Sequence, residues 1–405
     1  MEKLTNIPLL RFPEFKEGWE LKKLGQVTSY VDYRGRAPIK TEEGRFLVTA
    51  KNIKKGFIDY ECSKEYVAEN DYSNVMSKGL PEIGDVLFTT EAPMGNVAQI
   101  DKVNIALAQR VIKFRSKEML SNFYLLHYML SDIFQKNISQ KSIGTTVQGI
   151  SGKELHQIKL SFPTLSEQQK IATFLTAVDE KLQALKQKKK LLEQYKKGVM
   201  QQMFSQELRF KDDNGNAFAD WEEKKLGDLT FKVDKKNKEN IKYPVYSINN
   251  KEGFLPQSDQ FEGMDSNDRG YDTSIYKVIE SNTFAYNPAR INVGSIGFSG
   301  ELSKIIISSL YVCFKTIDLL EDGYLLHFLN TKDFNKSVFE FQEGGVRSYL
   351  FYESFSKIKI PLPSNKEQTK IANFLSAIDD KINHCQAQIA RTEIWKKGLL
   401  QQMFC

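Results

Sequence analysis

Residues 164–204 read TLSEQQKIATFLTAVDEKLQALKQKKKLLEQYKKGVMQQMF, and residues 364–404 read SNKEQTKIANFLSAIDDKINHCQAQIARTEIWKKGLLQQMF. Both stretches contain a Glu-Gln-x-Lys-Ile-Ala start, a Lys-Lys-Gly segment and a Gln-Gln-Met-Phe end in one register. The motif Trp-Glu-x-Lys-Lys-Leu-Gly also occurs twice, beginning at Trp19 and at Trp221. Chance does not produce several matches at one spacing, so the chain is a tandem duplication.

The duplication fixes the domain plan of the 405-residue chain. Two units of about 200 residues are too few and too large for a solenoid and favour a molecule with internal pseudo-twofold symmetry. We predict an N-terminal arm at 1–18, a variable domain at 19–163, a central helix at 164–204, a linker at 205–220, a second variable domain at 221–363 and a C-terminal helix at 364–405.

Both similar stretches have the pattern of long helices. Each follows a proline and opens with Thr164-x-x-Glu167 or Ser364-x-x-Glu367, which predicts a capping box. Apolar residues then fall on positions spaced alternately by four and three, which is typical of a coiled-coil seam, with polar interruptions at Lys189, Lys196, Thr392 and Lys396. The seam positions are Ile171, Leu175, Val178, Leu182, Leu185 and Leu192, and Ile371, Leu375, Ile378, Ile382, Ile389 and Leu399.

Neither helix has a partner near it in the sequence. An antiparallel pairing of the two helices is therefore the simplest arrangement. Each seam packing on its own domain, or on another subunit, remains an alternative.

The variable parts combine both kinds of secondary structure. Segments such as Val111–Phe114 and Leu310–Phe314 have strand-like patterns, whereas Asn122–Leu130 has the pattern of a short apolar helix. The predicted fold class is α+β, with two mixed α/β domains separated by two long antiparallel helices.

Composition narrows the class of protein. Hydrophobic residues make up 41% and charged residues 27%, as in a soluble globular protein. No apolar run approaches the roughly 20 residues of a membrane span, and the first residues do not resemble a signal peptide. The four cysteines lack CxxC spacing, which favours a reduced, cytoplasmic protein that contacts no membrane.

The sequence offers no catalytic constellation. It contains no GxxxxGK[ST] phosphate-binding loop and no His/Cys grouping with metal-ligand spacing. His127 and His327 are flanked by leucines at equivalent helix positions, so we interpret them as packing residues. We expect a binding protein without catalytic or metal-ligating residues.

Several loops carry residues suited to nucleic acid. Arginine, lysine, asparagine and aromatic residues gather in Tyr30–Lys40, Lys51–Gly56, Asn249–Lys251, Asn287–Asn292 and Gly345–Tyr349. Arg and Lys can contact guanine or phosphate, and Asn can pair with adenine. Solvated loops without a ligand explain the same residues. The loops nevertheless differ between the copies, so two similar scaffolds would read two different targets.

The repeated Trp-Glu-x-Lys-Lys-Leu-Gly, the repeated Pro-x-x-x-Glu-Gln-x-x-Ile-Ala-x-Phe-Leu and Arg11–Phe15 together resemble the specificity subunit of type I restriction–modification systems. The resemblance covers nearly the whole chain. It implies two target recognition domains, each reading half of a split, asymmetric DNA site, and a helical spacer that sets the gap.

The resemblance also implies the partners and the division of chemistry. Two modification (methyltransferase) subunits and restriction (motor-nuclease) subunits would join the chain, with the seam positions above forming the spacer and docking surface. S-adenosylmethionine, ATP and Mg would be used by those partners, with no cofactor bound by this chain. A helical scaffold that recruits proteins without reading DNA is the alternative function.

In the family, DNA contacts come from the recognition-domain loops. By residue chemistry we expect double-stranded DNA to be contacted by Arg34, Arg36, Lys40, Lys51, Asn52, Lys54, Thr90 and Arg110 in the first copy, and by Asn250, Lys251, Arg290, Asn292, Arg347 and Ser348 in the second.

Overall fold

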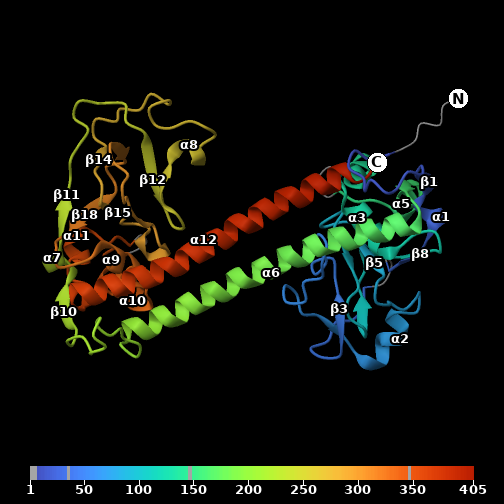
Figure 1. The fold of residues 1–405 in the computed structure, drawn as a ribbon, viewed down its shortest axis with the longest axis horizontal. Helices are drawn as coiled ribbons and strands as arrows, with labels where there is room; N and C mark the ends of the chain where they lie inside the picture. Colours follow the sequence, from blue (N-terminus) through green and yellow to red (C-terminus); the bar gives the residue numbers. More distant parts are fainter. Residues whose placement is uncertain (1–6, 34–36, 145–147, 345–347) are drawn as a thin grey trace. The chain divides into compact units, whose positions relative to one another are not determined.

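The computed structural model describes residues 7–33, 37–144, 148–344 and 348–405 (Figure 1). The chain forms two compact units. Unit 1 combines the chain up to Lys188 with Cys385–Cys405, and unit 2 is Lys189–His384. The unit boundaries therefore fall inside the two long helices, α6 (Leu165–Phe204) and α12 (Asn365–Gln402), and each unit contains part of both.

Unit 1 contains a mixed α/β domain ahead of α6. Its elements are β1 (Glu20–Lys23), α1 (Leu24–Val27), β2 (Thr28–Asp32), β3 (Arg45–Val48), β4 (Tyr66–Val67), η1 (Glu69–Asp71), α2 (Tyr72–Val75), β5 (Val86–Thr89), β6 (Val97–Gln99), β7 (Ile105–Leu107), β8 (Val111–Ser116), α3 (Asn122–Leu130), α4 (Asp132–Lys141), α5 (Gly152–Gln157) and β9 (Lys159–Phe162).

Three sheets organise this domain. An antiparallel sheet has the order β2-β8-β5-β6, a second sheet has the order β4-β3-β7 with β3 and β7 parallel, and β1 pairs with β9. The buried runs of β5 and β8 place apolar residues on both faces of the first sheet, between the second sheet and α3. Short loops at the strand ends are thereby held on a packed frame.

Unit 2 repeats this plan. Its elements are β10 (Glu222–Lys225), α7 (Leu226–Leu229), β11 (Thr230–Val233), β12 (Val245–Asn249), β13 (Gly253–Pro256), α8 (Gln257–Gln260), β14 (Lys277–Ile279), β15 (Phe284–Tyr286), η2 (Ile291–Val293), β16 (Ile296–Phe298), β17 (Ile305–Ile307), β18 (Val312–Thr316), α9 (Asp322–Phe328), α10 (Lys332–Phe341), α11 (Tyr352–Phe355) and β19 (Lys359–Leu362). The sheets are β11-β18-β15-β16, β13-β12-β17-β14 and β10-β19. The predicted fold class is confirmed.

The two long helices pair with each other inside each unit. In unit 1, Lys396 of α12 pairs with Asp179 of α6, and Lys186 Nζ lies 2.7 Å from Glu393 Oε1. Residue numbers rise along one helix as they fall along the other, so the pairing is antiparallel. In unit 2, Lys196 Nζ lies 2.6 Å from both oxygens of Asp379. The predicted mutual pairing is confirmed within each unit.

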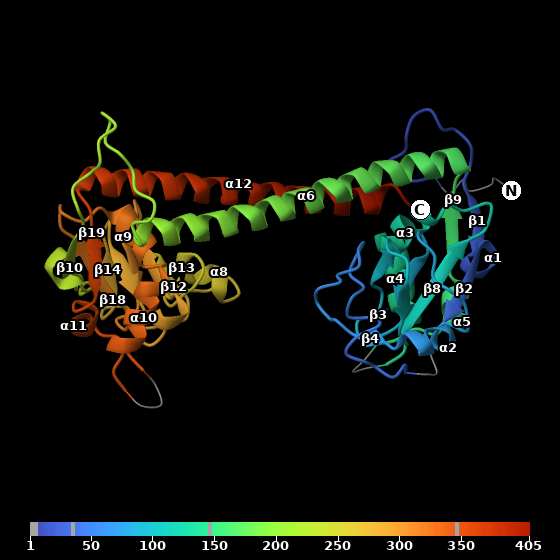
Figure 2. The same ribbon diagram turned by 90° about the horizontal axis from the view of Figure 1, so that it is seen from below.

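The same helices also complete the domain cores. In unit 1, Leu175 belongs to the core together with Met403 and Phe404 from the end of α12. Figure 2 shows the C-terminal end of the chain close to α3 of this unit. The Phe404 ring lies 5.5 Å from that of Tyr124. Unit 2 has the equivalent arrangement, with Phe204 of α6 at 5.3 Å from Tyr324. Each core is therefore built from one variable domain, the start of the helix that follows it and the end of the other helix.

The predicted seam positions differ in how deeply they are buried. Eight are buried: Ile171, Leu175, Val178, Ile371, Leu375, Ile378, Ile389 and Leu399. Leu182, Leu185, Leu192 and Ile382 are half-buried. The eight buried side chains have no surface to offer another protein, and docking by the four half-buried positions stays a prediction.

A buried carboxylate fixes the start of each long helix. Arg11 donates from Nε and Nη2 to the two oxygens of Glu167, both at 2.7 Å, and Nη2 also donates to the carbonyl of Glu17. The Glu167 side chain is fully buried. This hydrogen bonding raises the pKa of the Arg11 guanidinium. A buried charge needs such a partner, because desolvation is costly.

The second copy repeats this contact with one addition. Arg209 donates to both oxygens of Glu367, at 3.1 and 2.9 Å, and to the carbonyl of Ala219 at 2.6 Å. Trp221 Nε1 also donates to Glu367 Oε2 at 2.9 Å. Within the described residues, Trp19 Nε1 in the first copy has no acceptor.

These contacts correct the predicted capping boxes. Ser364 Oγ accepts from the Glu367 amide at 3.4 Å, which is half of such a box, but both glutamates are taken by arginines. The segment 205–220, predicted as a linker, also has a structural role. Leu208 N donates to the carbonyl of Gln202 as Leu10 N donates to that of Gln402, so 208–220 is a second copy of the arm. The Leu-Arg-Phe shared by 10–12 and 208–210 is the sequence signal for it.

Candidate nucleic-acid interface

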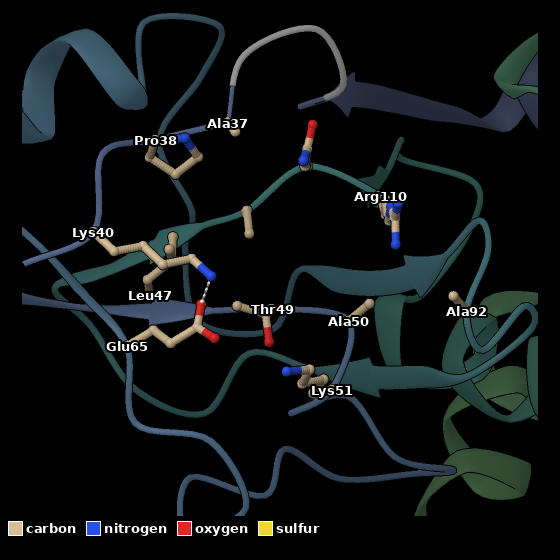
Figure 3. A pocket seen from close by; sticks show the side chains of 12 residues that line it. Ala37, Pro38, Lys40, Leu47, Thr49, Ala50, Lys51, Glu65, Ala92 and Arg110 are labelled. Atoms are coloured by element: carbon tan, nitrogen blue, oxygen red, sulfur yellow. Dashed lines mark ion pairs between the residues drawn. The ribbon is translucent and has the colours of Figure 1, made fainter.

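Three of the basic residues predicted in unit 1 meet around one pocket. Lys40, Lys51 and Arg110 line a cavity of about 250 Å³ (Figure 3). Figure 3 shows Lys40 and Arg110 on opposite sides of it, with Thr49 and Ala50 between them. Residues from separate loops thus bring three cationic side chains and the carboxylate of Glu65 to one opening. Phosphates and base edges are bound by such groups.

Acidic neighbours hold two of these cations in place. Lys40 Nζ lies 2.8 Å from Glu65, and Arg110 Nε lies 2.8 Å from Glu91. The Arg110 side chain is 50% exposed, and its backbone has a positive φ of 73°. A non-glycine residue in that region is uncommon and is kept by its surroundings. Arg110 is therefore a positioned side chain rather than a free one.

The Arg110 backbone joins the surrounding loops. Its carbonyl accepts from Thr90 N at 3.0 Å and from Thr90 Oγ1 at 3.2 Å. The Thr90 carbonyl in turn accepts from Ile150 N at 3.1 Å, and Glu91 forms a β-bridge with Gly149. The segments around 50, 91, 110 and 149 therefore form one surface.

The structure corrects the roles of Asn52 and Thr90, which are both buried. Asn52 Oδ1 accepts from Thr49 N and Oγ1, and its Nδ2 donates to the carbonyls of Asp59 and Ser63 at 2.9 and 2.8 Å. With these bonds made, Asn52 has no amide group left to offer a base. It shapes the loop that presents Lys51, and Thr90 shapes the loop next to Arg110.

The remaining residues that we predicted to contact DNA in the first copy are Lys54, Arg34 and Arg36. Lys54 is half-buried in a turn closed by its own amide and the carbonyl of Phe57. It does not line the pocket. Arg34 and Arg36 lie outside the described residues.

In unit 2 the corresponding loops converge as well. Gly294, with φ of 88°, lies so close to Asn250 that a Cβ added there would be 3.3 Å from the Asn250 carbonyl oxygen. Ser295 Oγ donates to the carbonyl of Ile248 at 2.8 Å. The loop that carries Arg290 and Asn292 is thereby packed against the end of β12.

The unit 2 loop is internally ordered and keeps its basic residue outside. Asn287 accepts from the amides of Ala289 and Arg290, both at 3.0 Å, and the Arg290 carbonyl accepts from Ser295 N. Arg290 is exposed, and Asn292 is half-buried. Leu350 N donates to the Pro288 carbonyl at 3.0 Å, which adds the segment after 347 to this surface.

The remaining residues predicted in unit 2 divide in the same way. Asn250 and Lys251 are exposed at the turn after β12, and Ser348 is half-buried. Arg347 lies outside the described residues. The role of all these residues in DNA contact stays a prediction.

The histidines have the packing role that the sequence predicts. His127 and His327 are buried, and their Nε2 atoms lie 3.1 Å from Thr176 Oγ1 and 3.3 Å from Ser376 Oγ. Burial lowers the pKa of His127 to about 3 and that of His327 to about 4. Both imidazoles are neutral at pH 7 and tie the helices α3 and α9 to α6 and α12.

The described part of the chain has two further properties that bear on function. It contains no group of His, Cys, Asp and Glu side chains arranged to hold a metal ion. None of its helices is both long and apolar enough to cross a membrane.

Comparison with known proteins identifies the domain type. A family model described as the type I restriction modification DNA specificity domain matches residues 16–194 and 219–391. The chain is 26% identical to the putative type I restriction enzyme MjaX specificity subunit of Methanocaldococcus jannaschii, over 98% of this chain and 95% of that one. It is 23% identical to the MjaVIII specificity subunit of the same organism, over 96% and 92%.

Solved structures agree on the fold. The type I restriction–modification S subunit from M. genitalium superposes with a TM-score of 0.64 at 16% identity, over 98% of this chain and 99% of that one. A chain from a structure of a type I R-M system gives a TM-score of 0.56 at 18% identity, over 96% and 97%. With two matches to the family model that together cover most of its length, the chain belongs to the family of type I restriction–modification specificity subunits.

Proposed function

We propose that this chain reads a bipartite, asymmetric DNA site, with one recognition domain for each half-site, and directs adenine methylation by partner subunits to it. The observation that carries the proposal is that one scaffold occurs twice with different side chains at equivalent loop surfaces. Unit 1 presents Lys40, Lys51 and Arg110, whereas unit 2 presents Asn250 and Arg290. Two similar frames with different side chains at their loops suit two different half-sites.

In this proposal the catalytic chemistry belongs to the partners. Modification subunits would use S-adenosylmethionine, and restriction subunits would use ATP and Mg. This chain would hold DNA and partners in register. Its own basic groups would supply the phosphate contacts and base-edge hydrogen bonds that select the site.

We propose one partner surface in each unit, at exposed positions of the long helices. Leu191 and Tyr195 of α6 are 56% and 53% exposed, and Ile394 and Trp395 of α12 are 73% and 46% exposed. Tyr195 and Trp395 occupy equivalent positions in the two copies. Partly exposed tyrosine and tryptophan side chains are typical anchors of protein interfaces. Tyr195→Ala and Trp395→Ala should each weaken capture of modification subunits without changing the sequence that is methylated.

The test of DNA reading is single-molecule sequencing of methylated adenines in cells that express this chain with its modification subunit. We expect a split, asymmetric motif that vanishes when the chain is deleted. Arg110→Ala should relax discrimination in one half of the motif and Arg290→Ala in the other, each by roughly 1–3 kcal/mol if the arginine contacts a base.

Lys232→Ala is the matched control, because Lys232 is an exposed cation on the edge strand β11. It should leave the motif unchanged. Methylation that persists unchanged without the chain would reduce the protein to a helical scaffold and would remove the loop assignments.

A further inference from the structure

Unit 2 carries a pair of aromatic side chains beside the Arg290 loop. The rings of Tyr349 and Phe351 stack with centroids 5.7 Å apart and planes 5° from parallel. Phe351 is 48% exposed, and Tyr349 is half-buried. Leu350 between them is fully buried. The alternation places both rings on the outer side of a segment whose middle residue is anchored in the core.

The backbone of this segment is fixed in place. Tyr349 N and the carbonyl of Tyr349 exchange hydrogen bonds with Glu343, both at 2.8 Å, and Leu350 N donates to the Pro288 carbonyl. Pro288 belongs to the same loop as the exposed Arg290. The stacked pair therefore lies on a segment that is hydrogen-bonded to the loop carrying Arg290, the cation that we propose contacts DNA.

The first copy shows that the fold does not require these rings. Gly149 and Ser151 occupy the equivalent positions, and the backbone contacts are the same: Ile143 and Gly149 exchange hydrogen bonds, and Ile150 N donates to the Thr90 carbonyl. Equal backbone contacts with different side chains point away from a packing role for the aromatic pair.

The aromatic residue also replaces a helix cap. Ser151 caps α5, since its hydroxyl accepts from Glu154 N at 3.1 Å. Phe351 has the same N-cap position before α11 and offers no side-chain acceptor. Serine is among the preferred residues there, and phenylalanine gives up that stabilisation while exposing a ring to water. Functional positions often lack a locally stabilising residue of this kind.

We propose that Phe351, backed by Tyr349, is an aromatic wedge that packs against a base step of the half-site read by unit 2, a contact that unit 1 does not make. Side chains that insert between base steps are large and apolar, and the steps they enter are those that unstack easily. This inference rests on the proposed DNA-reading function and adds recognition through DNA deformability to it.

The test uses the complex of this chain with its modification subunits and a duplex carrying the motif found by methylation sequencing. We compare the wild type with Phe351→Ser, which installs the residue of the first copy and the cap it provides. The affinity for the cognate duplex should fall about tenfold or more. Because the lost contact is apolar, the dependence of affinity on salt concentration should not change.

A fluorescent base locates the contact. With 2-aminopurine at successive adenines of the second half-site, the wild-type complex should show increased fluorescence at one step, and Phe351→Ser should abolish it. The matched control, Ser151→Ala in the first copy, should leave both readouts unchanged. Equal thermal midpoints for wild type and Phe351→Ser would exclude unfolding as the cause.

The outcomes separate the two proposals. If Phe351→Ser binds and unstacks the site as the wild type does while Arg290→Ala weakens binding, the wedge is overturned and DNA reading stands. If the wild-type complex binds cognate and scrambled duplexes equally, DNA reading by this chain fails, and the wedge fails with it.

Discussion

Arg11→Met should loosen the start of α6 more than Arg209→Met loosens the start of α12. Methionine keeps most of the aliphatic part of the arginine side chain and removes only the charged guanidinium group. In unit 1 this leaves the fully buried Glu167 without a cation, because Arg11 supplies both of the hydrogen bonds to its side chain that we describe. Stranding one partner of a buried pair costs about 3–5 kcal/mol.

The second copy has a partial substitute. Glu367 keeps the hydrogen bond from Trp221 Nε1 when Arg209 is removed. A hydrogen bond to a charged group is worth about 1.5–3 kcal/mol. Since the Arg11 side chain is 11% exposed, we take the lower end of the range for unit 1, about 3 kcal/mol, and about 2 kcal/mol or less for unit 2.

Amide hydrogen exchange, measured peptide by peptide, can compare the loss of local stability at the two helix starts. At 1.4 kcal/mol per tenfold, Arg11→Met should speed exchange in the first turns of α6 by about 150-fold, and Arg209→Met should speed it in the first turns of α12 by about 30-fold or less. Each unchanged copy is the control for the other. Equal acceleration in the two copies, or no acceleration around Glu167, would refute the assignment of the arm as a clamp on the helix start.

Three further measurements test other contacts. Asn52→Ala should lower the free energy of unfolding of unit 1 by about 2 kcal/mol in a urea titration, because the Asn52 amide is hydrogen-bonded internally. It should leave the methylated motif intact. A variant with an altered motif and unchanged stability would show that Asn52 contacts DNA. The free energy of unfolding should fall as the pH drops below about 6.5. His127 and His327 stay neutral in the folded chain until about pH 3 and 4, whereas the unfolded chain binds protons first. At pH 5 each histidine should lower the free energy of unfolding by about 2 kcal/mol. Changing both histidines to glutamine should make the free energy of unfolding less dependent on pH in this range. Lys396→Met should lower the free energy of unfolding by about 1 kcal/mol, because it removes the ion pair with Asp179. If Lys396→Met costs as much in an Asp179→Asn background as in the wild type, that pairing is contradicted.

The copy-to-copy comparison explains which site residues sequence reasoning could find. Lys40, Lys51 and Arg110 were recognisable by residue type, and the structure places them around one pocket. Phe351 was not, because a phenylalanine beside leucine in a single sequence indicates a core residue. Its exposure in the structure, compared with Ser151 at the equivalent position of the first copy, marks it as a departure.

By itself, the sequence determined the duplication, the two long helices and the mixed α/β domains, because repeat spacing and the four-three apolar pattern are local properties of a chain. Tertiary structure decided where those apolar residues go. Leu175 packs into its own domain with Met403 of the other helix, although the four-three spacing of seam positions continues far beyond that domain. It also decided that Glu167 binds Arg11 and that Asn52 is buried. Such choices depend on contacts between residues distant in sequence, since burial and charge pairing are set by what surrounds a side chain in space.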